Sequence, residues 1–484
     1  MSHIFNPPLF FLTTLVLAFS STLSLSPHNA AATSYEISTT VLHLKPPSLH
    51  QAHQQVLSYN PKTTIQQKNQ PNPTQTTSAS FFSLPLHPRD SLFNPHHNDY
   101  QTLIHSRLDR DSARLNSIIN NLHCNKSTRP RNITAPIISG TAQHSGEYFT
   151  RIGVGHPAKQ FYLFLDTGSD ITWLQCKPCY QCYKQSDPIF DPTKSTSYKS
   201  LTCKARQCKD TELTSCINNT CQYNVYYGDG SLSVGDLMTE TVSFASTGSV
   251  KRVAIGCGHF NTGLFVGAAG ILALGSGPLS FHSQIKATSF SYCLVNRDSR
   301  KSSTLEFNSP RPSDSLTTRL LKNPQQSSLY YVEFKGIKVG GKNVVVPKST
   351  FKIEKNGEGG MVIDSGTTVT RLEPRAYESV RDEFRLLTED LKRARGPPLF
   401  DTCYDFWGMS EVEVPTVSFE VSEGKLWTLP AENYLIPVDE NGTYCFAFAT
   451  SNFPVSILGN VQQQGNSITS IFTILKLLSE RRGE

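Results

Sequence analysis

From about Ser145 onward, short apolar runs alternate with clusters of Gly, Pro, Asn and Asp. Four of these runs read GEYFTRIGVG, KQFYLFLD, KRVAIGCG and LYYVEFKGIKVGG. Apolar runs of this length, rich in β-branched and aromatic residues and bounded by turn-forming residues, are typical of strands in an all-β body. The pattern therefore predicts a mainly β fold with a few short helices.

One segment of this body has helical spacing instead. Residues 374–394 place apolar side chains three or four positions apart, and so on one helical face, at Tyr377, Val380, Phe384, Leu387 and Leu391. Packing of that face against a sheet is a sufficient explanation, and no chemistry is assigned to it.

Residues 101–123 also have the spacing of an amphipathic helix. Its apolar positions lie beside three arginines, and together they are Leu103, Leu108, Leu115, Ile118, Arg107, Arg110 and Arg114. Two interpretations stay open for this basic helix. It is either part of a pro-segment that covers an acidic centre or a solvated linker.

The N-terminal hundred residues differ in composition from the body. Residues 1–26 include an apolar stretch of signal-peptide length, too short for a comfortable membrane span, although no Lys or Arg precedes it. Residues 27–100 are rich in Pro, Gln, Asn, His, Ser and Thr, which predicts a disordered or removed segment. No later run is apolar enough to span a bilayer. We therefore expect entry into the secretory pathway and an extracellular location.

Length and charge limit the function classes. A chain of 484 residues exceeds one comfortable hydrophobic core, which predicts two lobes plus tails. The formal net charge is +6, but residues 27–134 hold ten Lys or Arg and five Asp or Glu, so five of these charges lie ahead of the body. A nearly neutral body is not expected to bind nucleic acid.

Twelve cysteines suit the same secretory route, where disulfides are the usual state. Seven of them lie close together, at Cys176, Cys179, Cys182, Cys203, Cys208, Cys216 and Cys221. A zinc site at CKPCYQC is an alternative, but no second CxxC or His pair follows at the usual distance. Disulfides are the better interpretation. Glycosylation sequons occur at Asn125, Asn132, Asn218 and Asn441.

The candidate chemistry lies where two apolar runs end in an aspartate. KQFYLFLD ends at Asp166, and a buried isolated carboxylate needs a partner, hydrogen bonds or a proton. MVID ends at Asp364, which lies 198 residues later. Each aspartate is followed by a hydroxyl residue, a glycine and another hydroxyl residue, namely Thr167, Gly168 and Ser169 in the first copy and Ser365, Gly366 and Thr367 in the second. A single copy is weak evidence, but two copies one lobe apart are strong evidence.

Each part of this unit has a physical task. Glycine permits a tight turn, while hydroxyls and backbone N–H groups orient the carboxylate. Two such carboxylates roughly 3 Å apart cannot both ionise, so they share one proton and titrate as a pair. One then takes a proton from water while the other protonates a substrate carbonyl. This chemistry needs no covalent intermediate, cofactor or metal.

Over residues 140–465 the sequence resembles the pepsin-like aspartic proteases, in their plant nepenthesin-type (atypical) branch. Tyr227, Gly228 and Asp229 resemble the flap hairpin, and Trp173 matches the tryptophan that hydrogen-bonds the flap tyrosine in that family. Residues 267–277 and 456–460 resemble the two apolar elements behind the catalytic loops, and the cysteine cluster resembles the branch's insertion.

The resemblance implies a bilobal fold with an active-site cleft between two β lobes. It divides the chain into a signal peptide (1–26), a partly disordered pro-segment (27–137), an N-terminal β lobe with a Cys-rich insertion (138–325), a C-terminal β lobe (326–465) and a divergent tail (466–484). It also implies five disulfides, Cys176–Cys257, Cys179–Cys182, Cys203–Cys221, Cys208–Cys216 and Cys403–Cys445.

By the same resemblance, the chain is expected to be a secreted aspartic endopeptidase made as a zymogen. Asp166 and Asp364 are expected to activate water, and Tyr227 to close over a bound polypeptide. The pro-segment is expected to inhibit the enzyme intramolecularly, and the protein is expected to be a monomer. Acidic pH is expected to be optimal because the aspartate pair must hold one proton. The alternative is a catalytically inactive, pepsin-fold binding or inhibitor protein.

The sequence departs from the family pattern in two places, and the second, in the C-terminal tail, supports this alternative. Ala273 replaces a glycine close behind Asp166, which costs of order 1 kcal/mol if φ is positive there. After Gly465 the tail has the pattern of an amphipathic helix with a charged end. This tail lacks the cysteine expected to pair with Cys293, and the strands that normally help to close the second lobe.

Overall fold

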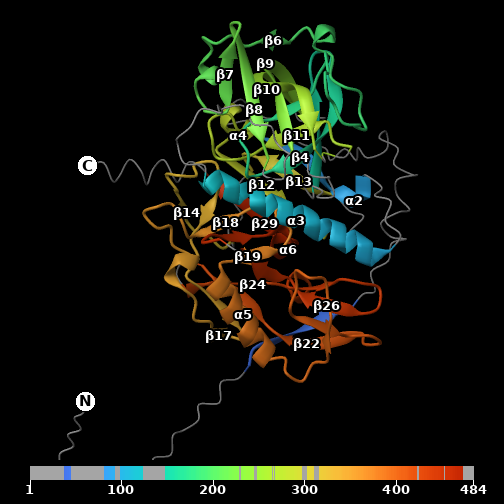
Figure 1. Ribbon diagram of the computed structural model, residues 1–484, viewed down its shortest axis with the longest axis vertical. Helices are drawn as coiled ribbons and strands as arrows, with labels where there is room; N and C mark the ends of the chain where they lie inside the picture. The colour runs from blue at the N-terminus through green and yellow to red at the C-terminus, as the bar shows by residue number, and fades with distance from the viewer. Residues whose placement is uncertain are drawn as a thin grey trace, which may run out of the picture. The chain divides into compact units, whose positions relative to one another are not determined.

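The computed structural model describes residues 37–44, 81–92, 99–123 and 148–471, the last range with gaps at 228–230, 245–247, 264, 266, 297–301, 310–314, 422–423 and 452. The predicted signal peptide, Gly228, Asp229 and the last thirteen residues lie outside these ranges. Figure 1 shows the arrangement of the described elements.

The largest sheet has thirteen strands and is built mainly from the first half of the body. Its main path runs β29-β12-β13-β2-β3-β4-β11-β5-β10-β9-β8-β7, and β6 pairs with β9. Two of these strands come from outside the first half of the body, namely β2 (Phe82–Pro88) and β29 (Ser467–Ile471). The central strand β4 is buried without interruption over residues 161–166, which explains its unbroken apolar run. The body strands are β3 (Tyr148–Val154), β4 (Lys159–Asp166), β5 (Trp173–Gln175), β6 (Lys199–Ser200), β7 (Thr214–Ile217), β8 (Thr220–Tyr226), β9 (Leu232–Phe244), β10 (Gly248–Thr262), β11 (Gly270–Ala273), β12 (Ser289–Cys293) and β13 (Ser303–Phe307).

The second half forms three smaller sheets around its own buried core. The six-stranded sheet contains β14 (Leu320–Leu321), β15 (Tyr331–Val332), β18 (Met361–Ile363), β28 (Ser456–Leu458), β19 (Thr370–Leu372) and β27 (Phe448–Thr450). One four-stranded sheet contains β16 (Gly336–Val339), β17 (Lys342–Asn343), β23 (Val417–Glu420) and β24 (Leu426–Thr428). The other contains β20 (Arg393–Ala394), β21 (Cys403–Asp405), β25 (Leu435–Pro437) and β26 (Thr443–Phe446). The predicted mainly β, two-lobed architecture is confirmed.

Helices are few and mostly short. The helix predicted at 374–394 is confirmed as α5 (Pro374–Leu386), but it ends earlier than its apolar spacing suggested. The chain turns after Leu386, where the N–H of Leu391 donates to the carbonyl of Thr388 at 3.2 Å, and Arg393 and Ala394 then form strand β20, which pairs with β21. The other helices of the body are α4 (Phe281–Gln284) and α6 (Asn460–Gln463).

The segment ahead of the body is more ordered than predicted. Strand β1 (Thr39–His43), strand β2 (Phe82–Pro88) and helix α2 (Arg89–Leu92) lie in the stretch 27–100 that composition had assigned to disorder. Strand β2 alternates buried and less buried residues, and it lies between β13 and β3 in the large sheet. The alternation of apolar and polar residues in β2 covers only seven positions within a polar segment, so the composition of residues 27–100 concealed it. The strands that pair with β2 are also far away in sequence.

Strand β1 attaches to the second half instead. It pairs antiparallel with β22 (Glu411–Pro415), and Leu42 is buried in the core of that half. The N–H of Ser38 donates to the carbonyl of Gly340 at 3.0 Å, and that of Leu44 donates to Ser410 at 2.9 Å. The segment ahead of the body is therefore bound to both halves.

The start of the C-terminal tail is a strand, so the helix predicted there is wrong for these residues. Strand β29 (Ser467–Ile471) pairs antiparallel with β12, with Ser467 opposite Cys293. The alternation of polar and β-branched residues in SITSI suits an edge partner of a sheet. Cys293 is a free, partly buried thiol.

The methyl group of Ala273 is accommodated without the anticipated strain. Ala273 is fully buried and lies opposite Asp166 in the parallel β11–β4 pair. It is not among the non-glycine residues with positive φ, so its backbone does not require glycine.

The described residues form five disulfides, and two of them differ from the pairing that the resemblance implied. Cys203 is joined to Cys216 and Cys208 to Cys221, with Cα–Cα distances of 5.3 and 5.7 Å. Cys216 and Cys221 lie directly opposite each other in the β7–β8 hairpin, so both are within reach of the incoming loop. The path of that loop, which sequence spacing does not reveal, decides between them.

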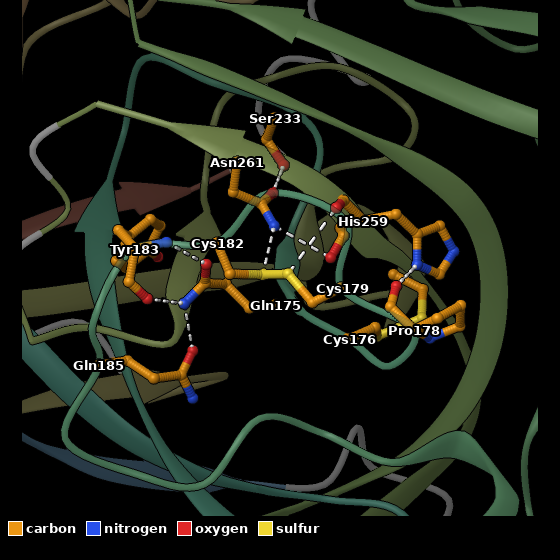
Figure 2. Close-up of a disulfide and its surroundings, with 12 residues drawn as sticks. Gln175, Cys176, Pro178, Cys179, Cys182, Tyr183, Gln185, Ser233, His259 and Asn261 are labelled. Carbon is orange, nitrogen blue, oxygen red and sulfur yellow. Dashed lines mark hydrogen bonds between the residues drawn. A yellow bond between two sulfur atoms is a disulfide. The ribbon is translucent and has the colours of Figure 1, made fainter.

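The other three disulfides, Cys176–Cys257, Cys179–Cys182 and Cys403–Cys445, agree with the implied pairing. Figure 2 shows Cys179–Cys182, with the amide of Asn261 directed at the Cys182 sulfur at 3.6 Å. Since all three cysteines of CKPCYQC are in disulfides, the zinc alternative has no thiolate there. Within the described ranges, no helix combines the length and apolar composition needed to cross a membrane.

Peptide mapping by mass spectrometry tests the revised pairing. Digestion with proteases that cut between Cys203 and Cys208, between Cys208 and Cys216 and between Cys216 and Cys221 is expected to yield the linked peptides 203–216 and 208–221. Recovery of 203–221 and 208–216 instead would restore the pairing implied by the resemblance.

Candidate active site

The two aspartate loops meet because each follows a buried strand that has a parallel neighbour. Strand β11 lies beside β4, and the N–H of Leu274 donates to the carbonyl of Asp166 at 2.7 Å. Strand β28 lies beside β18 in the same way, and the N–H of Asp364 donates to Leu458 at 3.2 Å. The apolar elements at 267–277 and 456–460 thus lie behind the two loops, as the resemblance implied.

Hydrogen bonds tie one loop to the other. The Thr167 hydroxyl accepts a hydrogen bond from the N–H of Ser365 at 3.1 Å and donates to Asp364 Oδ1 at 3.2 Å. It also lies 3.3 Å from the Ser365 hydroxyl. These contacts fix the distance between the loops.

Each carboxylate has a donor from its own loop. The N–H of Gly168 donates to Asp166 Oδ1 at 3.0 Å, and the Thr367 hydroxyl donates to Asp364 Oδ2 at 2.7 Å. The Ser169 hydroxyl is buried without a hydrogen-bond partner, so it does not hold the carboxylate in this state. Asp166 is 5% exposed and Asp364 is fully buried.

Tyr227 and Trp173 are joined as the resemblance implied, because the Trp173 indole N–H donates to the Tyr227 hydroxyl at 2.8 Å. Both side chains are buried. Phe265, which sequence reasoning did not single out, packs edge-on to both rings with centroid distances of 4.9 and 5.6 Å. Gly228 and Asp229 lie outside the described residues.

Arg114 occupies the space between the two carboxylates. Its Nη2 lies 2.6 Å from Asp166 Oδ1 and 3.1 Å from Asp364 Oδ1, and its Nε lies 3.0 Å from Asp364 Oδ2. Sequence reasoning placed Arg114 on a basic helix without distinguishing it from Arg107 and Arg110. The two aspartates therefore lie on either side of one guanidinium nitrogen.

The charges in this cluster shift the pKa values of Asp364 and Arg114 in opposite directions. Burial acts to raise the pKa of Asp364, but the charge of Arg114 and its hydrogen bonds outweigh burial and hold this pKa below its usual range. For Arg114, burial acts to lower the pKa, and the two aspartates raise it well above its ordinary value. The three groups form a buried ionic cluster in this state.

The glycines of the two loops leave room for this guanidinium. A Cβ at Gly168 would lie 2.2 Å from Arg114 Nη2, and a Cβ at Gly366 would lie 3.0 Å from its Nε. A side chain at Gly168 would displace this guanidinium, and one at Gly366 would require it to shift by a few tenths of an ångström.

Arg114 is carried by helix α3 (Tyr100–His123), which Figure 1 shows crossing between the strands of the first half and those of the second half. Its apolar face packs on the second half through Tyr100, Leu103, Ile104 and Leu108. Arg107 and Arg110 are buried against Asp90 of α2, at 2.7 and 4.0 Å. The helix is thus confirmed, and its interpretation as a solvated linker is wrong.

Asp111 fixes the same helix to the second half. Its carboxylate accepts hydrogen bonds from Arg371 Nε at 2.9 Å and from the N–H of Val369 at 3.3 Å, and it also contacts Arg371 Nη2 and the N–H of Thr368. Asp111 and Arg371 are 1% and 3% exposed.

Comparison with protein-family models matches most of the body. The xylanase inhibitor N-terminal family matches residues 148–308, and the xylanase inhibitor C-terminal family matches residues 329–469. Among solved structures, the crystal structure of edgp aligns with a TM-score of 0.60 at 19% identity, covering 83% of this chain and 94% of that one. Basic 7S globulin from soybean aligns with a TM-score of 0.54 at 15% identity, covering 81% and 94%. At these identities the structures show the fold alone.

Curated relatives are closer in sequence. "Protein ASPARTIC PROTEASE IN GUARD CELL 2" of Arabidopsis thaliana is 44% identical over 81% of this chain and 85% of its own length. "Aspartyl protease family protein 2" of the same plant is 50% identical over 75% and 77%. "Aspartic proteinase nepenthesin-2" of Nepenthes gracilis is 39% identical over 69% and 76%. Together with the paired aspartate loops, these matches show that the chain belongs to the pepsin-like plant aspartic protease family that includes the nepenthesins.

Proposed function

We propose that the chain is the zymogen of a secreted aspartic endopeptidase. The observation that carries this proposal is the pair of matching loops that brings Asp166 and Asp364 to opposite sides of one nitrogen of Arg114. The relatives that match over most of their length are named as aspartic proteases or proteinases.

In the active form, water takes the place of the guanidinium and the two carboxylates share one proton. The ionised carboxylate accepts a proton from this water, whose oxygen attacks the peptide carbonyl carbon. The protonated carboxyl donates its proton to the carbonyl oxygen, and reversal of these roles lets the amine leave. The loop hydrogen bonds of Thr167 and Thr367 hold the carboxylates in place. Tyr227, braced by Trp173, closes over the polypeptide.

The pro-segment keeps this site inactive by filling it. Arg114 supplies the positive charge that the proton supplies in the active form, and α3 occupies the space over the pair. Strands β1 and β2 hold the segment to the two halves at either side of that helix. Latency therefore depends on contacts at three separate places, with Arg114 as the one that touches the reacting groups.

The docked helix responds to pH in a definite direction. The pKa of Asp364 is lowered while Arg114 is docked, so docking is favoured when this carboxyl is ionised. This contribution is fully present above the pKa of the undocked state and is lost as pH falls through the lowered pKa. Acid therefore favours release of the helix and also supplies the shared proton.

Secretion is supported by the disulfide framework and by two sequons at exposed positions. Five disulfides suit an oxidising compartment. Asn218 and Asn441 are exposed and so accessible to glycosylation. An inactive binding protein is less favoured, because both aspartate loops are assembled and the start of the tail pairs with β12.

Replacement of one aspartate tests the chemistry. Asp166→Asn in the acid-treated full chain is expected to lower peptide cleavage at about pH 3–5 by roughly 10²- to 10⁴-fold, because proton transfer is lost. Asp382→Asn is the matched control, since its carboxylate is 61% exposed, and it is expected to cleave at the wild-type rate. Equal rates for Asp166→Asn and wild type would remove the aspartate pair from the mechanism.

Replacement of the arginine tests latency. Arg114→Gln leaves the carboxylates without their cation, so the zymogen is expected to convert at a higher pH and about tenfold or more faster at a given acidic pH. Gel analysis of the conversion time course measures this change. Asp109→Asn, at an exposed position of the same helix, serves as the control. Conversion of Arg114→Gln with wild-type rate and pH dependence would refute the inhibitory role of Arg114.

A further inference from the structure

A second buried charged cluster lies near the aspartate pair in the second half, and its pocket is the space that the Asp111 carboxylate fills. Arg371 lies on β19, between β27 and β28, and its guanidinium is 3% exposed. Its Nη1 lies 3.5 Å from the carbonyl of Thr450, and its other two nitrogens face the carboxylate of Asp111. The N–H groups of Thr368 and Val369 face the same carboxylate.

These donors belong to the body, whereas the carboxylate belongs to α3. Among the described residues, Asp111 is the acidic residue within ion-pair distance of Arg371. The hydroxyl of Thr368, next to this pocket, is buried without a hydrogen-bond partner. When α3 leaves, the guanidinium and the two backbone donors lose their charged acceptor, and either water or another anion takes its place.

The pocket is close enough to the aspartate pair to take a side chain of a bound substrate. Asp111 precedes Arg114 by three residues on α3, so the two side chains project from neighbouring positions about one helical turn apart. Arg114 lies on the aspartate pair while Asp111 lies in the pocket. A polypeptide that replaces α3 over the pair therefore passes the pocket within a few residues of its scissile bond.

We propose that this pocket is a substrate subsite for an acidic side chain, with Arg371 as its specificity-determining residue and Asp111 as the pro-segment's stand-in for that side chain. This inference rests on the proposed peptidase function. Arg371 and the N–H groups of Thr368 and Val369 bind the Asp or Glu carboxylate in the arrangement now made with Asp111. Charge-assisted hydrogen bonds of this kind are stronger than neutral ones.

The subsite has a pH signature of its own. A substrate Glu has an ordinary pKa of about 4.3, so it is ionised at about pH 5.5 and largely protonated at about pH 3. Its advantage over Gln is therefore expected at the higher pH and to fade at the lower one. The pH dependence of the aspartate pair is different, because the pair keeps its shared proton as the pH falls.

The experiment uses the acid-treated full chain and pairs of peptides that differ by one Glu-to-Gln change. The change is placed in turn at each position near the scissile bond of a cleaved neutral peptide. At one position, Glu is expected to raise kcat/KM about tenfold over Gln at about pH 5.5, and the ratio is expected to approach one at about pH 3.

Variants then assign the effect to Arg371. Arg371→Gln is expected to abolish the Glu-to-Gln ratio and Arg371→Lys to retain part of it, whereas Arg375→Gln, at an exposed position of α5, keeps it. If Arg371→Gln does not fold, the Glu-to-Gln ratio of kcat/KM in the wild type and its pH dependence decide whether the acidic subsite exists. Cleavage of the Gln peptides with no gain from Glu at any position would overturn the subsite and leave the peptidase standing. Failure to cleave any peptide would overturn the proposed function, and the subsite with it.

Discussion

Two carboxylates held side by side in a nearly dry site repel each other, and the structure depends on how that repulsion is relieved. In the described state Arg114 relieves it by placing a guanidinium against both. The body alone offers hydroxyl and backbone donors, which orient the carboxylates without cancelling their charge. A proton or a cation is therefore obligatory, and the proposed zymogen and active form differ in which of the two is present.

The strands beneath the site explain why the repulsion does not push the loops apart. Each aspartate follows a central strand with a parallel neighbour behind it, and the hydroxyl of Thr167 links the two loops. The backbone on each side is thus held by a sheet rather than by a free loop. Such support holds a small set of polar groups in one geometry around the guanidinium.

Much of this arrangement was predictable from the sequence because its signals are local. Apolar runs ending in aspartate identified the two loops, and their repetition one lobe apart indicated that they meet. Residues 374–386 showed their helical period directly. The hydrogen bond between Trp173 and Tyr227 was implied by the family resemblance, since their pairing depends on tertiary structure.

The features that were missed depend on contacts between segments far apart in the chain. The helical pattern does not distinguish among Arg107, Arg110 and Arg114. Only the position of α3 in the fold decides which of them contacts Asp166. Asp111 and Arg371 are 260 residues apart, and neither belongs to a motif. The partners of Cys203 and Cys208 depend on a loop path, and β1 and β2 depend on strand edges that the rest of the fold provides.

Strand β2 has a consequence for how the molecule matures. It lies inside the large sheet, with β13 on one side and β3 on the other, and both Leu84 and Leu86 are fully buried. If the pro-segment is removed as proposed, two rows of backbone donors and acceptors lose their partner together, and unpaired strand edges invite association with other chains. On this proposal, removal of β2 leaves the edges of β13 and β3 in need of a new partner before the opened sheet meets a neighbouring molecule.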